Sequence, residues 1–133
     1  GKITSIEDCY NASPDSMRAA IRTLRDTAGN KKIAVLGDML ELGDYAETAH
    51  TQVGEMVGEY GIDYLLAYGN DAAFYVSAAK KSGCENAFLF DDKDALTKKL
   101  LEITNDGDAV IFKGSRGMKL EDVINSAYKV WEK

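Results

Sequence analysis

Short apolar runs alternate with segments of helical period along the whole chain. The apolar runs have the alternating or continuous pattern of β-strands, and they cover residues 2–8, 31–37, 62–69, 86–90 and 108–114. The second run reads "KKIAVLG", a continuous apolar stretch that is typical of a strand buried on both faces of a parallel sheet. The pattern therefore predicts five strands, at least one of them central.

Between and after these runs, apolar residues recur at helical spacing. The predicted helices cover residues 14–28, 45–60, 70–81, 92–103 and 120–132. Strict alternation of strands and helices predicts a three-layer, Rossmann-like α/β fold, an open and mostly parallel sheet with helices on both faces. We expect residues 1–133 to form a single domain. Because the chain begins with Gly and opens almost directly on a strand, we also expect it to be part of a longer protein.

The helix starts carry recognisable capping signals. Ser13 followed by Pro14 is a plausible cap with proline at the first helical position. Asp44 and Glu47 have the spacing of a capping box, and Asn70 can cap the third helix. These assignments account for the polar residues at helix starts without invoking a ligand.

The charge and composition limit the possible partners. A net charge of −6 and a pI near 4.8 argue against a nucleic-acid binder or a protein of the membrane surface, since both need a basic face. No apolar run approaches the length of a membrane span, so we expect a cytoplasmic protein without membrane insertion. Cys9 and Cys84 lie far apart in no metal-binding pattern, which favours free thiols and no metal site.

Ligands of parallel α/β sheets bind at the carboxyl ends of the strands, so the loops that follow the strands are the candidate sites. In the first loop, helix capping leaves Asp8, Tyr10 and Asn11 unexplained. An acid in that place is a suitable partner for ribose hydroxyls. A solvated loop is the alternative on position alone.

The loop after the second strand reads "GDMLELGD", which is not the glycine fingerprint of dinucleotide sites. Met39, Leu40 and Leu42 are apolar enough to pack onto a neighbouring domain or a ligand. Asp38 and Glu41 could accept hydrogen bonds from a substrate amine. The alternative is a packed turn with solvated acids.

The loop "KGSRGM" after the fifth strand combines two cations, Lys113 and Arg116, with the hydroxyl of Ser115 and two glycines. Arg116 could hold a carboxylate or phosphate through two hydrogen bonds. The alternative is solubilising charge before a helix. The only histidine, His50, lies within the second predicted helix, so we expect it to have a structural role. No phosphate-binding loop of the G-x-x-x-x-G-K-[ST] type is present in the sequence.

Taken together, "DCYNASPDSM", "IAVLGDMLELGDYAETAH" and "VIFKGSRGMKLEDVI" resemble the carboxyl-terminal domain of the Mur ligase family, over essentially the whole chain. The resemblance implies the third domain of a three-domain enzyme that adds D-alanyl-D-alanine to UDP-N-acetylmuramoyl-tripeptide in peptidoglycan synthesis. It implies that ATP, Mg²⁺ and a carbamylated lysine act in the central domain. It also implies that the present chain supplies no catalytic side chain and no metal ligand, and that it is inactive alone.

The resemblance also assigns two sets of binding residues. The set for ATP is Asp8, Tyr10 and Asn11. The set for the incoming dipeptide D-Ala-D-Ala is Gly69, Asn70, Lys113, Ser115 and Arg116. The partners that it implies are these small molecules and the central ATPase domain of the same chain.

Two other functions fit the pattern of elements. A phosphoacceptor receiver domain would use Glu7 and Asp8 after the first strand and Lys113 after the fifth. Against this reading, Asp71 lies past the end of the third strand, and Gly rather than Pro follows Lys113. The other alternative is an interaction module of the same fold that binds no ligand.

Overall fold

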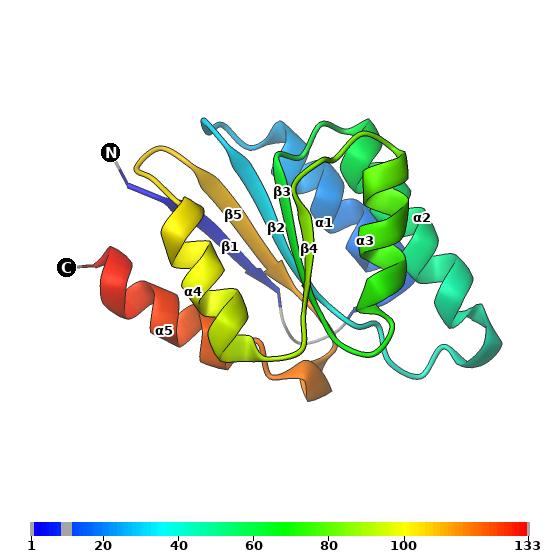
Figure 1. Ribbon diagram of the computed structural model, residues 1–133. Helices are drawn as coiled ribbons and strands as arrows, with labels where there is room; N and C mark the ends of the chain where they lie inside the picture. Colours follow the sequence, from blue (N-terminus) through cyan, green and yellow to red (C-terminus); the bar gives the residue numbers. More distant parts are fainter. Residues whose placement is uncertain (1, 9–11, 133) are drawn as a thin grey trace.

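The computed structural model describes residues 2–8 and 12–132. Strands and α-helices alternate along the chain (Figure 1). The strands are β1 Thr4–Asp8, β2 Lys32–Gly37, β3 Tyr64–Tyr68, β4 Ala87–Phe90 and β5 Ala109–Lys113. The helices are α1 Pro14–Asp26, α2 Ala46–Glu59, α3 Ala72–Lys81, α4 Lys93–Ile103 and α5 Glu121–Trp131, with 3₁₀ turns η1 Gly43–Tyr45 and η2 Arg116–Met118.

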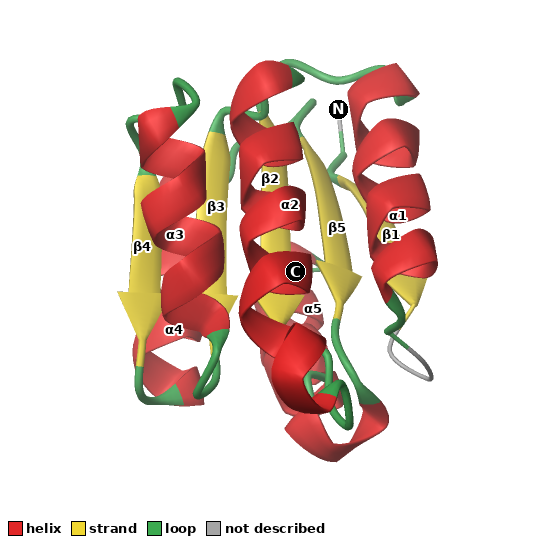
Figure 2. Cartoon of the chain, turned by 90° about the vertical axis from the view of Figure 1, so that its right-hand side faces the viewer, coloured by secondary structure: helices red, strands yellow, loops and turns green. Residues whose placement is uncertain are grey.

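The strands form one sheet in the order β1-β5-β2-β3-β4, and every neighbouring pair is parallel. Helices α1, α2 and α3 cover one face, and α4 and α5 cover the other (Figures 1 and 2). The predicted three-layer α/β fold is therefore confirmed. Because β5 returns between β1 and β2, the loops that follow β2, β3 and β5 lie at adjacent positions on one edge of the sheet.

Two hydrophobic cores lie on the two faces of the sheet. The core under α1–α3 includes Met17, Ile21 and Tyr75, and the core under α4 and α5 includes Leu96 and Val123. Alternate residues of β2 and β5 enter opposite cores, which explains why both strands are apolar without interruption. Each large apolar side chain buried in this way contributes roughly 1.5–3 kcal/mol.

The predicted elements all exist, but two of the predicted caps are wrong. The start of α2 is a 3₁₀ turn with no side-chain cap, so Asp44 and Glu47 do not form a capping box. Helix α3 is preceded by Asp71, again without a cap from its own side chain. The start of α1 is as predicted, since the Ser13 hydroxyl accepts from the Ser16 backbone N–H. Within the described part of the chain, no helix has the length and apolar character needed to cross a membrane.

Candidate functional site

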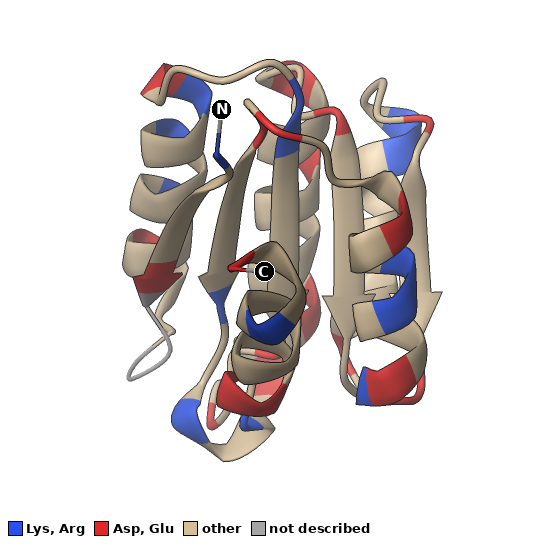
Figure 3. Ribbon diagram, turned by 90° about the vertical axis from the view of Figure 1, so that its left-hand side faces the viewer, with Lys and Arg blue, Asp and Glu red and all other residues tan. Residues whose placement is uncertain are grey.

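Three loops meet at the carboxyl edge of the sheet, one after each of β2, β3 and β5. Backbone pairing places the end of β5, Lys113, between Asp8 of β1 and Leu36 of β2. Basic positions mark the end of β5 and the loop that follows it (Figure 3). The topology thus brings together loops that are far apart in sequence, as the prediction of a site at this edge requires.

Asp38 connects the first two of these loops. Its carboxylate accepts the backbone N–H of Asn70 at 2.7 Å and that of Asp71 at 3.1 and 3.2 Å. The start of α3 is therefore capped by an acid from a different loop, and not by Asn70. Burial raises the pKa of the Asp38 carboxyl, and the two N–H groups offset only part of this effect.

Gly69 is explained by the same carboxylate. Its φ is +135°, and a Cβ at this position would lie 2.3 Å from Asp38 Oδ1. A side chain at residue 69 would displace the carboxylate and strain the backbone. The glycine therefore has a structural reason, in addition to the contact with substrate that the sequence predicts.

Ser115 connects the third loop to the first. Its backbone N–H donates to the Asp38 carbonyl at 3.0 Å, and its Oγ accepts the N–H of Leu40 at 2.8 Å. Because a hydroxyl that accepts one bond keeps its own proton, Ser115 can still donate to a ligand. The loops after β2, β3 and β5 thus form one hydrogen-bonded unit around Asp38.

Two buried side chains support this unit from below. His50 Nε2 accepts the N–H of Met39 at 3.0 Å, which requires the neutral tautomer whose Nδ1–H donates to the Ala46 carbonyl at 2.6 Å. The Tyr75 hydroxyl donates to the Gly37 carbonyl at 2.9 Å, and its ring lies 4.7 Å from that of His50. Burial raises the pKa of Tyr75 well above its usual value, so it remains a neutral donor. His50 has the structural role that the sequence predicts.

The apolar residues of the "GDMLELGD" loop divide between the core and the surface. Met39 is fully buried in the core under α1–α3, whereas Leu40 is 42% exposed. Leu42 is partly buried against the same core. Of the two acids predicted to accept from a substrate amine, Asp38 is buried, whereas Glu41 is exposed at a positive φ of 62°.

The other predicted binding residues lie around these loops in different settings. Asp8 ends β1 beside Lys113, at the carboxyl edge. Tyr10 and Asn11, like Cys9, lie outside the described residues. Lys113 is completely buried, and Arg116 is exposed in η2.

A pocket of about 510 Å³ opens between the loops after β2, β3, β4 and β5. Gly69 and Asn70 line it, but Lys113, Ser115 and Arg116 do not. Asp38 and Leu40, which the sequence singled out in the loop after β2, also line it. The remaining lining residues are Tyr68, Phe90, Asp91, Lys93, Gly117, Met118 and Lys119. The pocket thus combines acidic, basic and apolar side chains. From the sequence, the only signal for this pocket is that its residues follow successive strands.

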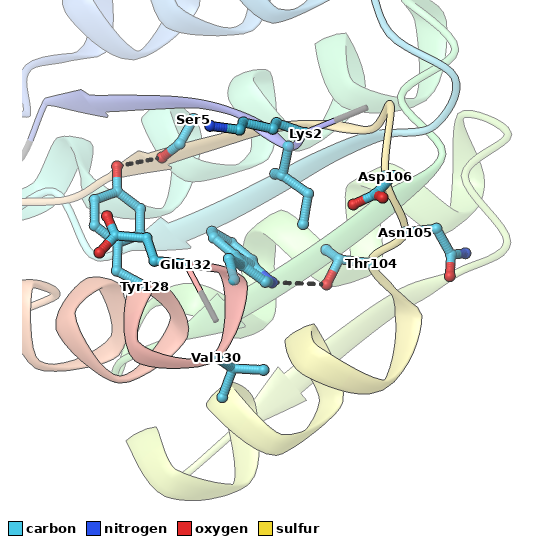
Figure 4. A pocket seen from close by; sticks show the side chains of 10 residues that line it. Lys2, Ser5, Thr104, Asn105, Asp106, Tyr128, Val130 and Glu132 are labelled. Atoms are coloured by element: carbon cyan, nitrogen blue, oxygen red, sulfur yellow. Dashed lines mark hydrogen bonds between the residues drawn. The ribbon is translucent and has the colours of Figure 1, made fainter.

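A larger pocket, of about 980 Å³, lies at the opposite edge, between the start of β1 and the ends of α4 and α5 (Figure 4). Several of its polar groups are already bonded to each other. Trp131 Nε1 donates to Thr104 Oγ1 at 3.2 Å, and the hydroxyl groups of Tyr128 and Ser5 are hydrogen-bonded at 2.8 Å. The smaller pocket, at the carboxyl edge, is therefore the better candidate for a functional site.

Two further observations concern a metal site and the receiver-domain alternative. Among residues 2–8 and 12–132, no three His, Cys, Asp or Glu side chains gather as metal ligands. The strand order β1-β5-β2-β3-β4 also differs from the order 2-1-3-4-5 of receiver domains such as CheY, because β1 lies at the edge of the sheet. The receiver alternative is therefore wrong.

The fold and the site define a Rossmann-like α/β domain with a polar pocket at the carboxyl edge of its sheet. The chain belongs to the family described as Mur ligase, glutamate ligase domain, whose model matches residues 1–116.

The relatives make this assignment more specific. The chain is 41% identical over 124 residues to the UDP-N-acetylmuramoyl-tripeptide--D-alanyl-D-alanine ligase of Bacillus subtilis, and 37% identical over 123 residues to that of Escherichia coli. These matches cover 92% and 91% of the chain but only 27% and 26% of the two enzymes. The chain thus spans about a quarter of the length of its curated relatives.

Solved structures agree with the sequence comparison. The MurF ligase of Thermotoga maritima in complex with ADP matches with a TM-score of 0.83 at 28% identity, over 99% of this chain and 30% of that one. MurF of Acinetobacter baumannii matches with a TM-score of 0.84 at 27% identity, over 97% of this chain and 29% of that one.

Proposed function

We propose that this chain is the acceptor-binding domain of a longer ATP-dependent ligase, which joins D-alanyl-D-alanine to UDP-N-acetylmuramoyl-tripeptide in peptidoglycan synthesis. The observation that carries the proposal is the pocket at the carboxyl edge, because it presents both acidic and basic side chains to a small zwitterion. The names of the relatives, and the family to which the chain belongs, support the same reaction.

In this reaction ATP phosphorylates the terminal carboxylate of the tripeptide. The amine of the dipeptide then forms the new C–N bond, the C–O bond to phosphate breaks, and the amine loses a proton. Since the nucleophile belongs to the substrate, the domain needs no catalytic side chain. It contributes by holding the dipeptide beside the acyl phosphate, which raises the effective concentration of the amine. We assign Mg²⁺ to the central domain that the family resemblance implies.

We propose that Gly69 and Asn70 contact the dipeptide within the pocket. We also assign the loop after β5 to the dipeptide site, with Arg116 exposed on this loop and Lys113 buried at its start. Ser115 holds this loop against Leu40 and has a proton left to donate. Of the proposed set, Gly69 and Asn70 alone line the pocket.

We propose that ATP lies next to the end of β1. We assign Asp8, the last residue of β1, to the ribose hydroxyls, and Tyr10 and Asn11, which follow it in sequence, to the same nucleotide. The ADP bound to the Thermotoga relative supports a nucleotide in this enzyme class. Because its nucleotide substrates occur in the cytoplasm, we place the reaction in that compartment.

The test is an assay of the full-length ligase for phosphate release. We expect release to require both D-Ala-D-Ala and UDP-N-acetylmuramoyl-tripeptide, and the isolated chain to release none. Asp8→Ala should raise the KM for ATP and leave that for the dipeptide nearly unchanged. Phosphate release that does not depend on the dipeptide would contradict the proposed function.

A further inference from the structure

The positive charge that lines the pocket comes from Lys93 and Lys119, not from the Lys113 and Arg116 that the sequence singles out. We propose that the ammonium group of Lys119 recognises the terminal carboxylate of the incoming dipeptide, with Lys93 fixed beside it. This inference rests on the proposed function and makes it more specific, since it names the residue that selects a free carboxylate.

The backbone of Lys119 is held in an unusual conformation. Its φ of 53° and ψ of 46° are left-handed, and Glu41 is the only other non-glycine residue with positive φ in the part of the chain that the structure describes. Lysine rarely adopts this conformation, and such exceptions concentrate at functional sites. Hydrogen bonds fix it, because the Lys119 N–H donates to the Arg116 carbonyl at 3.2 Å and the Lys119 carbonyl accepts from Asp122 at 3.2 Å.

The two pocket lysines differ in how much of their charge is already used. Lys93 Nζ lies 2.6 Å from Asp122 Oδ2 and 3.4 Å from the Lys119 carbonyl. Its hydrogen bond with Asp122 raises the pKa of Lys93, so it remains charged but largely neutralised by its partner. Lys119 is exposed and makes no ion pair among residues 2–8 and 12–132. Its charge is therefore available to an anion that enters the pocket.

The rest of the pocket suits the other parts of a small dipeptide. The acids Asp38 and Asp91 provide negative charge for an ammonium group. Apolar walls come from Tyr68, Phe90 and Met118, which favour small alkyl side chains. Opposite charges around one pocket with apolar walls match a zwitterion with short side chains.

The test compares D-Ala-D-Ala with its C-terminal amide as substrates of the full-length ligase. We expect the wild type to prefer the acid in kcat/KM by roughly tenfold or more, because a charge-assisted hydrogen bond is lost with the amide. Lys119→Gly should remove this preference by lowering kcat/KM for the acid alone. Glycine accepts the left-handed backbone, so the loop should keep its shape.

Three further variants make the result specific. Lys119→Arg should restore most of the preference for the acid, because it restores the charge. Arg116→Ala, at another residue assigned to the dipeptide site, should lower kcat/KM for acid and amide alike and so keep the preference for the acid. Lys129→Ala, which removes an exposed lysine of α5 outside the pocket, should behave as the wild type.

A preference that survives in Lys119→Gly but disappears in Arg116→Ala would overturn the inference and leave the proposed function intact. Failure of Lys119→Arg to restore the preference would also overturn it, since the effect would then come from the backbone. If the wild type releases no phosphate with either the acid or the amide, the proposed function itself fails.

Discussion

Two buried aspartates at opposite edges of the sheet differ in what they do for the molecule. Asp108, just before β5, accepts the N–H of Lys31 at 3.0 Å and of Asn105 at 2.9 Å, and lies 3.1 Å from Lys31 Nζ. Asp38, just after β2, accepts only backbone N–H groups in the described structure and has no cationic partner.

The pKa values of the two carboxyl groups move in opposite directions. Burial alone would raise the pKa of Asp108, but the N–H groups of Asn105 and Lys31, together with the Lys31 ammonium, outweigh burial and lower it. At Asp38 burial dominates and the pKa is raised. Asp108 lies at the edge formed by the amino ends of the strands, here called the amino edge, and its charge stabilises the fold. Asp38 lies at the carboxyl edge, and its charge costs stability while it orders the loops of the pocket.

The largest expected effect is at the amino edge. Asp108→Ala leaves the N–H groups of Lys31 and Asn105 without their acceptor, so we expect a loss of about 3 kcal/mol in the free energy of unfolding. Urea denaturation measures this loss. Asp106→Ala, which removes an exposed acid from the same loop, is the control and should change stability by under about 0.5 kcal/mol. Equal losses for the two variants would contradict the role assigned to Asp108.

A smaller loss is expected at the carboxyl edge from Gly69→Ala. The new Cβ would overlap the Asp38 carboxylate and strain the backbone, at a cost of about 2 kcal/mol. Gly61→Ala is the matched control, because Gly61 also has positive φ, at 70°, but has nothing within 4 Å of the added Cβ. We expect about 1 kcal/mol there. Similar losses would mean that contact with Asp38 does not matter at residue 69.

These two edges also show what the sequence could and could not predict. The apolar pattern was enough for all five strands and helices, because each element buries a face set by its own residues. The capping of α3 was not predictable, because the acceptor is Asp38, 32 residues before Asn70 in sequence. Lys93 and Lys119 likewise share a pocket only because β5 returns to the middle of the sheet. Local chemistry was enough to predict a site at the carboxyl edge of the sheet. The topology decides which side chains line that site.

The opposite pKa shifts predict opposite effects of pH. Because the pKa of Asp108 is lowered on folding, its contribution is fully present above the unfolded value of about 3.9 and is lost as the pH falls through the folded pKa. The stability deficit of Asp108→Asn should therefore shrink in acid. The raised pKa of Asp38 has the reverse consequence, because protonation favours the folded state. Relative to Asp38→Asn, the wild type should gain stability as the pH falls below the folded pKa of Asp38.

Urea denaturation at a series of pH values between about 3 and 7 measures both differences. If the free energy of unfolding changed with pH in the same way in both variants, the opposite roles assigned to Asp108 and Asp38 would be wrong. Asparagine is suitable at both sites because it keeps the shape of the side chain and one acceptor oxygen.

The smallest expected effect tests whether Ser115 and Asp38 hold different loops of the pocket. Ser115→Ala removes the acceptor for the Leu40 N–H, but this amide is exposed and water can replace the hydroxyl, so the loss of stability should be about 0.5 kcal/mol. Hydrogen exchange is the more sensitive measurement. The Leu40 amide should exchange faster, whereas the amides of Asn70 and Asp71 should stay protected, because Asp38 remains their acceptor. Faster exchange at all three amides would mean that Ser115, rather than Asp38, holds the carboxyl-edge loops together.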